Sequence, residues 1–169
     1  MDLQSLPIDL ERDGFVRHLI GELSGLLEEV VGIEEARGFI ALVGQRVGLH
    51  LDGLYSAHLG EGDWTPEQLA AVLVDLKRRI HGGFRIESVD GSAIVLVNDA
   101  CPFGARVVGR PSLCMMTSNV FGTLAAQHLG FASVALPETI ARGDARCRVL
   151  VQFDAVASSA PDARQYSRA

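Results

Sequence analysis

Three cysteines are the residues of this sequence best suited to chemistry. Cys101, Cys114 and Cys147 are the only cysteines in the chain, and all lie in its C-terminal half. Thiolates bind zinc and Fe–S clusters and are also strong nucleophiles. Such metals usually take four ligands, so three cysteines leave one position that His128, Glu138, water or a small ligand could fill. No C-x-x-C pair is present, and buried free cysteine is common, so a metal or ligand site and a set of core thiols both remain open.

The local sequence predicts a different backbone position for each cysteine. Cys101 follows an apolar run and precedes Pro102, so its backbone should be extended and lead into a turn. Cys114 lies just before or at the start of a helical stretch, where unpaired backbone amides favour the thiolate form. Alternation over residues 146–153 puts Cys147 on the apolar face of a strand, so we expect it to point inward.

Three helices are expected before the cysteine region. Apolar residues recur at helical spacing over 12–30, 36–47 and 66–80. The third helix begins with a capping-box pattern, in which Thr65 caps the helix and Gln68 completes the box. The second helix carries Gly44 and Gly48 one turn apart, although glycine is unfavourable inside a helix. Either another helix approaches closely there, for example across a dimer interface, or two glycines are tolerated at a weak point.

From residue 84 the apolar pattern changes to that of strands. Runs over 84–89 and 92–98 flank Asp90-Gly91, a strong hairpin signal. A helix capped by Thr117 or Ser118 should then run to Leu129, followed by strands over 131–136 and 146–153.

This order predicts an α+β fold: N-terminal helices packed on a four-stranded antiparallel sheet, with one further helix between two hairpins. We expect residues 1–10 to be an irregular lead-in, residues 11–156 to form a single domain, and residues 157–169 to be a flexible tail.

Composition excludes several classes of protein. The chain has 169 residues, of which 48% are hydrophobic, and a net charge of -6. A length of this order predicts one globular domain, and the acidic balance argues against direct binding of nucleic acid. Lys77, Arg78 and Arg79 form a basic cluster, which we interpret as cations near a helix C-terminus. With no basic leader and no apolar run long enough to span a membrane, we expect a cytoplasmic protein with reduced thiols.

Short motifs around the cysteines resemble a known family. Three stretches are similar to the 4-vinyl-reductase-like sensory domains, and most similar to the family called methanogen output domain 1. They are residues 101–104, Cys114 with Phe121-Gly122, and residues 139–143 with Cys147. The layout is also similar to that of the L-2-amino-thiazoline-4-carboxylate hydrolase family. The resemblance implies a helical layer on an antiparallel sheet, dimerisation through the N-terminal helices, a small hydrophobic ligand, and zinc held by cysteines and a glutamate. The sequence departs from the zinc pattern, because no glutamate directly precedes a close cysteine pair.

Three hypotheses follow for function. The first, which we favour, is a non-enzymatic cytoplasmic sensory or regulatory domain. It binds a metal (zinc or an Fe–S cluster) or a small ligand at Cys101, Cys114 and Cys147, forms a homodimer, and signals through a partner protein. The second is a small-molecule hydrolase with Cys114 as nucleophile and His128 or Asp144 as base. The third is a cofactor-free interaction module whose cysteines belong to the core.

Overall fold

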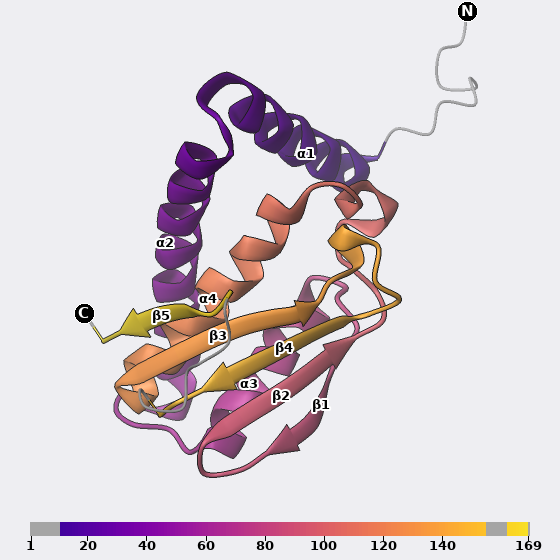
Figure 1. Cartoon of the computed structure of the whole chain (residues 1–169). Coiled ribbons are helices and arrows are strands. Elements are labelled where there is room, and N and C mark those ends of the chain that lie inside the picture. Colours follow the sequence, from indigo (N-terminus) through magenta and orange to yellow (C-terminus); the bar gives the residue numbers. More distant parts are fainter. Residues whose placement is uncertain (1–10, 155–161, 169) are drawn as a thin grey trace, which may run out of the picture.

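The computed structural model describes residues 11–154 and 162–168, which form helices on one side and a sheet on the other (Figure 1). The elements in chain order are α1 (Arg12–Val31), α2 (Ile33–Leu59), α3 (Pro66–Arg79), β1 (Phe84–Val89), β2 (Ala93–Asn98), the 3-10 helix η2 (Gly104–Val107), α4 (Pro111–Leu129), β3 (Phe131–Glu138), the 3-10 helix η3 (Ile140–Arg142), β4 (Cys147–Gln152) and β5 (Arg164–Ser167). This order confirms the predicted α+β class.

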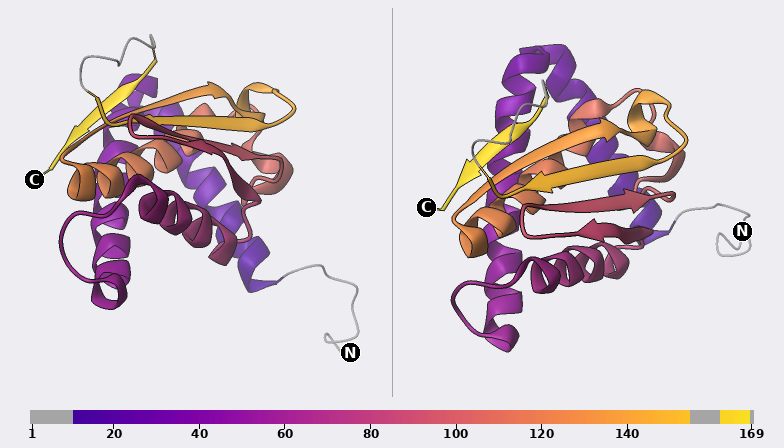
Figure 2. Two further views of the ribbon diagram at one scale, coloured as in Figure 1. Left: turned by 90° about the horizontal axis from the view of Figure 1, so that it is seen from below. Right: turned by 60° about the horizontal axis from the view of Figure 1, so that its bottom comes forward.

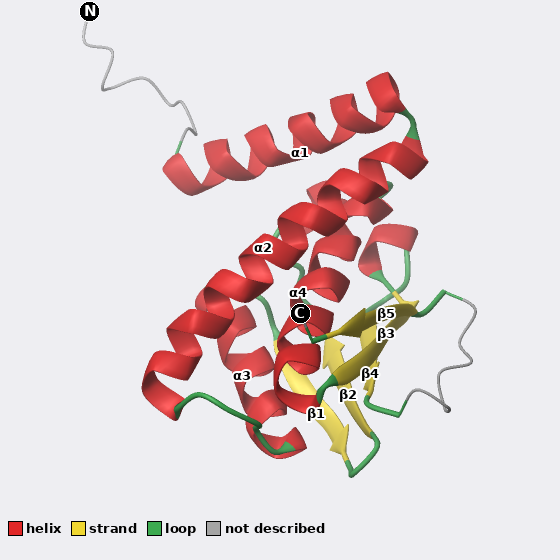
Figure 3. Ribbon diagram, turned by 90° about the vertical axis from the view of Figure 1, so that its left-hand side faces the viewer, coloured by secondary structure: helices red, strands yellow, loops and turns green. Residues whose placement is uncertain are grey.

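The helices lie in layers on one face of the sheet. α3 packs on β1 and α4 packs on β3 and β5, and α2 lies outside α4 (Figures 2 and 3). α1 folds back from the far end of α2 as the outer arm of a helical hairpin (Figure 1). The main core therefore fills the space between α3, α4 and the sheet, with Phe121, Leu73 and Leu124 among its fully buried residues.

The sheet is antiparallel throughout, with strand order β1-β2-β4-β3-β5. The hairpin at Asp90 is as predicted, and the Asp90 carboxylate accepts hydrogen bonds from the backbone N–H groups of Ser92 and Ala93. Along β4, buried Cys147, Val149 and Val151 alternate with half-buried residues, as the period of two requires.

The prediction of four strands was one too few. β5 lies within residues 157–169, which we expected to be a flexible tail, and it pairs with β3. The Tyr166 side chain fixes β5 on α4, because its hydroxyl hydrogen-bonds Ser118 and Asn119, each at 3.0 Å. These are contacts with a distant helix, which the composition of the tail does not reveal.

α4 begins earlier than predicted. Its first residue is Pro111, a favourable residue at that position, so Thr117 and Ser118 lie inside the helix rather than at its cap. Their hydroxyls have tertiary partners instead: Thr117 Oγ1 accepts from Lys77 Nζ at 2.7 Å, and Ser118 pairs with Tyr166. The capping box of α3, by contrast, is present as predicted.

Gly44 and Gly48 allow α2 to approach α4 closely. A Cβ atom built on Gly44 would stand 2.5 Å from the Asn119 Cβ, and one built on Gly48 would stand 2.8 Å from the Thr123 Cβ. The close-approach interpretation is therefore confirmed, but the approaching helix belongs to the same chain and not to a dimer partner.

Candidate functional site

The three predicted cysteines lie around one small cavity. Cys101 follows β2, Cys114 lies in the first turns of α4, and Cys147 is the first residue of β4. The cavity has a volume of about 90 Å³, and its wall is mainly apolar, with all three cysteines and Lys77 contributing to it. We call it the cysteine cavity. Segments far apart in the sequence thus bring the predicted residues together between the helices and the sheet.

Backbone N–H groups in or directly before the two 3-10 helices face the sulfur atoms of the cysteines. The Ile140 N–H donates to Cys147 Sγ at 3.4 Å. Backbone hydrogen bonds from Phe103 and Gly104 lower the pKa of the Cys101 thiol, and one from Ala141 lowers that of Cys114. Each sulfur therefore has a polar backbone partner at the edge of an otherwise apolar cavity.

Burial keeps two of the thiols protonated. It raises the pKa of Cys114 to about 11, and the charges of the neighbouring Cys147 and Cys101, when these are ionised, act in the same direction. The pKa of Cys101 is also raised, again mainly by burial. The expectation that the helix start would favour a Cys114 thiolate was wrong, because desolvation outweighs the amide partial charges. Cys114 thus lacks the low pKa of an activated nucleophile.

Lys77 is a candidate functional residue that sequence reasoning missed. Its side chain is 7% exposed, and its ammonium lies 5.4 Å and 5.3 Å from the ring centroids of Phe84 and Phe121. Burial lowers the pKa of Lys77 to about 8, while the charges of the three cysteines, when ionised, act in the opposite direction. The available signal was that Lys77 is the only lysine in the sequence, and that it continues the apolar face of α3.

His128 does not reach the cysteine cavity. It is buried near the other end of α4, fourteen residues or roughly 21 Å along the helix from Cys114. Its ring stacks on Trp64 with centroids 3.4 Å apart, and its nitrogens contact the Gly62 carbonyl and the Asp52 carboxylate. Its position favours a structural role in joining α2, α4 and the loop that holds Trp64.

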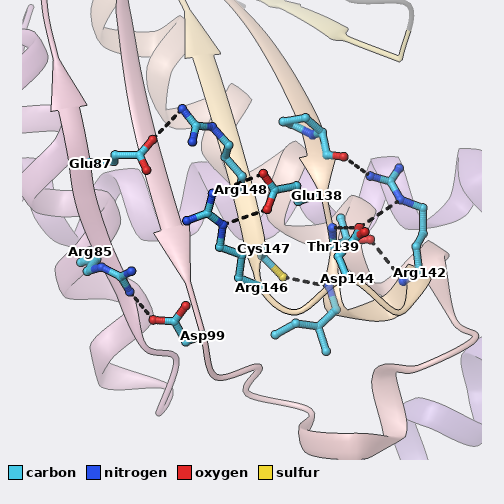
Figure 4. A network of polar contacts seen from close by, with 12 residues as sticks. Arg85, Glu87, Asp99, Glu138, Thr139, Arg142, Asp144, Arg146, Cys147 and Arg148 are labelled. Carbon is cyan, nitrogen blue, oxygen red and sulfur yellow. Dashed lines mark hydrogen bonds and ion pairs between the residues drawn. The ribbon is translucent and has the colours of Figure 1, made fainter.

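Glu138 takes part in a network of charged residues outside the cavity (Figure 4). Arg146 donates to Glu138 at 2.8 Å, which lowers the pKa of that carboxyl, and Arg148 pairs with Glu87 at 2.6 Å. Figure 4 shows Arg148 of β4 reaching Glu87 of β1 across the intervening strand β2. The Cys147 sulfur, on the same stretch of chain, accepts the hydrogen bond from the Ile140 N–H. Glu138 is thus engaged by Arg146 rather than by the thiols.

Asp144, the other base considered for a hydrolase, closes the turn before β4. Its carboxylate accepts a hydrogen bond from the Thr139 N–H at 2.6 Å and lies 3.9 Å from Arg142 Nε. Neither Asp144 nor His128 is among the residues that line the cysteine cavity. The described residues therefore do not form the nucleophile and base pair that the hydrolase hypothesis requires.

A complete metal site is not formed by the described residues. Among them, no group of three or more His, Cys, Asp or Glu side chains is arranged to hold a metal ion. Both fourth-ligand candidates lie elsewhere, as described above. The three thiols and their N–H partners provide soft donors, but the set does not fit zinc or an Fe–S cluster as it stands.

A larger pocket adjoins the cysteine cavity. Its volume is about 330 Å³, and it shares Cys114, Leu136 and Thr139 with the smaller cavity. Its wall also includes Arg142 and Arg164. Cys114 and its neighbours therefore separate a small apolar space from a larger one whose wall is more polar.

A helical layer on one face of an antiparallel sheet, with a cysteine-lined cavity between them, defines this chain as an α+β domain with an internal pocket. The chain belongs to the methanogen output domain 1 family, whose model matches residues 19–152. One solved structure with a similar fold is the phenol-responsive sensory domain of the transcription activator PoxR with phenol. It has a TM-score of 0.63 and 18% sequence identity, covering 86% of this chain and 76% of that chain. Among curated proteins, no relative matches.

Within residues 11–154 and 162–168, no helix is both long and apolar enough to cross a membrane.

Proposed function

We propose that this sensory domain binds a small, largely apolar ligand in the cysteine cavity and passes the signal to a partner protein. One observation carries the proposal: three thiols and a buried ammonium surround a cavity between the helical layer and the sheet. Binding sites of this kind combine an apolar wall with a few polar groups. The name of the similar PoxR domain, which responds to phenol, supports a ligand of the size of a small aromatic.

The fold offers a route by which ligand binding reaches the surface. Cys114 lies at the start of α4, and α4 packs tightly against α2 at Gly44 and Gly48. A ligand that displaces the start of α4 would therefore also move α2, because the backbone of α2 at the two glycines is in direct contact with side chains of α4.

The cytoplasmic location that we expect agrees with reduced thiols at the site.

The N-terminal helices supply a surface for a second copy of the chain. In α1 the buried residues are Gly21 and Ser24, while Leu23 is 60% and Val30 is 79% exposed. Exposed apolar surface continues along α2 at Phe39 and elsewhere. Apolar patches of this extent mark interaction sites, and we propose that they form the homodimer interface.

The dimer is tested by light scattering during size-exclusion chromatography. The wild-type chain should elute as a dimer, and Leu23→Asp should elute as a monomer with an unchanged circular dichroism spectrum. Ile86→Asp is the matched control, because Ile86 is an exposed apolar residue on β1. A monomeric wild-type protein at all concentrations would refute the dimer.

Ligand binding is tested by calorimetry with phenol as the first probe, followed by small aromatic acids and amides. Leu136→Trp should abolish binding by filling the space that both pockets share. Ile86→Trp, at an exposed position of β1 that lines neither pocket, should bind as the wild type does. The proposal fails if no probe binds, or if the cysteine-to-serine triple variant and Leu136→Trp both bind every probe with wild-type affinity.

A thiolate-bound metal is the second candidate. The described residues supply only three of the usual four ligands, but backbone N–H groups near the three sulfurs would stabilise thiolates that bind a metal together with water or an external ligand. Metal analysis and an absorption spectrum of protein purified without oxygen distinguish the two candidates. Stoichiometric zinc or iron that is lost in the cysteine-to-serine triple variant would replace the ligand proposal with a metal site. Metal-free protein that binds a probe would support the small ligand.

A further inference from the structure

We propose that the ligand of the cysteine cavity is a small organic anion, a carboxylate or a phenolate, whose negative charge binds the Lys77 ammonium. This inference rests on the proposed function and adds the chemical class of the ligand.

The argument begins with the surroundings of the Lys77 ammonium. It donates one hydrogen bond, to Thr117 Oγ1 at 2.7 Å, and it faces the aromatic rings of Phe84 and Phe121. An ammonium has three donors, so one hydroxyl and two ring faces replace only part of its hydration. Phe84 and Thr117 also line the cysteine cavity, which places the charged end of Lys77 at the cavity wall.

No counterion is found for this charge in the described part of the chain. Lys77 is the one charged residue among the described residues that line the cavity, where the remaining polar groups are thiols, hydroxyls and the Asn98 amide. The three cysteines face Lys77 from the loop after β2, from α4 and from β4, and burial holds Cys101 and Cys114 in the neutral form. A buried charge without a partner is costly, and a bound anion would remove that cost.

The presence of lysine instead of arginine at position 77 also supports a small anionic ligand. The fourteen other basic residues of the chain are all arginines, and Lys77 is the only lysine. An ammonium is a compact charge that fits a small cavity, whereas a guanidinium needs a larger planar site. Apolar rings on one side and a cation on another suit a ligand with an apolar body and one anionic group.

The experiment compares acids with amides of the same shape. Isobutyrate and isobutyramide, and benzoate and benzamide, are titrated by calorimetry at pH 7 into the wild-type chain, Lys77→Met and Lys77→Arg. We expect each acid to bind the wild type about tenfold or more tightly than its amide, as a charge-assisted hydrogen bond implies. Lys77→Met should lose this preference and still bind the amides, and Lys77→Arg should restore part of it.

A matched control variant and a direct measurement of the Lys77 pKa accompany the affinity measurements. Arg79→Met removes an exposed cation from the same helix and should leave the preference unchanged. Growth on labelled lysine places one side-chain label in the protein, at Lys77, so its NMR titration reads the pKa of that residue without assignment. The acids should raise the pKa of Lys77 above its free value of about 8, and the amides should leave it unchanged.

The outcomes separate this inference from the proposed function. If phenol and the amides bind in the cavity as tightly as the acids, and no acid raises the pKa of Lys77, the anion is refuted while the small-ligand function stands. If none of the probes binds, both fail. An acid preference that persists in Lys77→Met would assign the anion to another cation and overturn the role of Lys77.

Discussion

Gly48 of α2 lies against Thr123 of α4 so closely that a Cβ atom on the glycine would stand 2.8 Å from the Thr123 Cβ. One turn earlier, Gly44 meets Asn119 in the same way. The two contacts fix the distance between the helix that carries Cys114 and the helix that carries much of the exposed apolar surface.

Substitution of these glycines should therefore destabilise the fold. Gly44→Ala and Gly48→Ala force α2 away from α4, and we expect each to lower the free energy of unfolding by about 1–3 kcal/mol. Gly53→Ala is the control in the same helix, because a Cβ at Gly53 has nothing within 4 Å. It should raise stability by up to about 1 kcal/mol through helix propensity. Urea denaturation measures all three, and equal effects in the three variants would contradict the close packing.

Lys77→Met should stabilise the ligand-free protein. The pKa of Lys77 falls from 10.5 to about 8 on burial, which corresponds to a cost on the order of 3 kcal/mol at pH 7. Methionine has a similar volume and no charge, so it removes this cost. The free energy of unfolding at pH 7 is the measurement, with Arg79→Met as the exposed control, and a strongly destabilised Lys77→Met would mean that the ammonium is paired.

The same residue predicts how stability depends on pH. Above pH 8 the folded state has released the Lys77 proton while the unfolded chain still holds it, so stability rises with pH toward 10.5. The raised pKa values of Cys101 and Cys114 have the opposite effect: they lower stability with rising pH once the thiols of the unfolded chain begin to ionise, above about pH 8.5. The rise is therefore expected just above pH 8 in the wild type and should be absent from Lys77→Met. Denaturation curves across this range test it.

Cys114 should react slowly with alkylating agents. Its pKa of about 11 means that the thiolate is scarce at neutral pH, and the cavity restricts access to it. The rate of iodoacetamide labelling, followed by peptide mass spectrometry, should keep rising with pH well beyond the point, near pH 8.5, where a free cysteine levels off. Fast labelling at pH 7 would restore the hydrolase hypothesis.

Gly122→Ala should detach β5 from the rest of the fold. A Cβ atom at Gly122 would stand 2.1 Å from a carbon of the Tyr166 ring, so the ring must leave α4 and give up its hydrogen bonds to Ser118 and Asn119. Hydrogen exchange should then increase over 164–167 and along the edge of β3. Tyr166→Phe keeps the ring and loses the hydroxyl, so it should increase hydrogen exchange less than Gly122→Ala does. If the amides of β5 in Gly122→Ala were as protected as in the wild type, the contact between Gly122 and Tyr166 would be contradicted.

The sequence by itself determined the order of the α-helices and strands up to β4 and the approximate place of the cysteines. Periodicity gave three helices before the first hairpin, the capping box marked the start of α3, and alternation placed Cys147 on the buried face of β4. These features depend on neighbours a few positions away, so local pattern is sufficient to predict them.

Only the tertiary structure decided which residues share a site. His128 and Glu138 were plausible fourth ligands by type, but His128 contacts Asp52 from α2, and Glu138 pairs with Arg146 across the turn between β3 and β4. Lys77 lies in the last turn of α3, as predicted, but the packing of α3 on α4 also buries it beside the thiols. Burial also reversed the expected direction of the Cys114 pKa. Desolvation and long-range partners depend on the whole fold, and no local pattern encodes them.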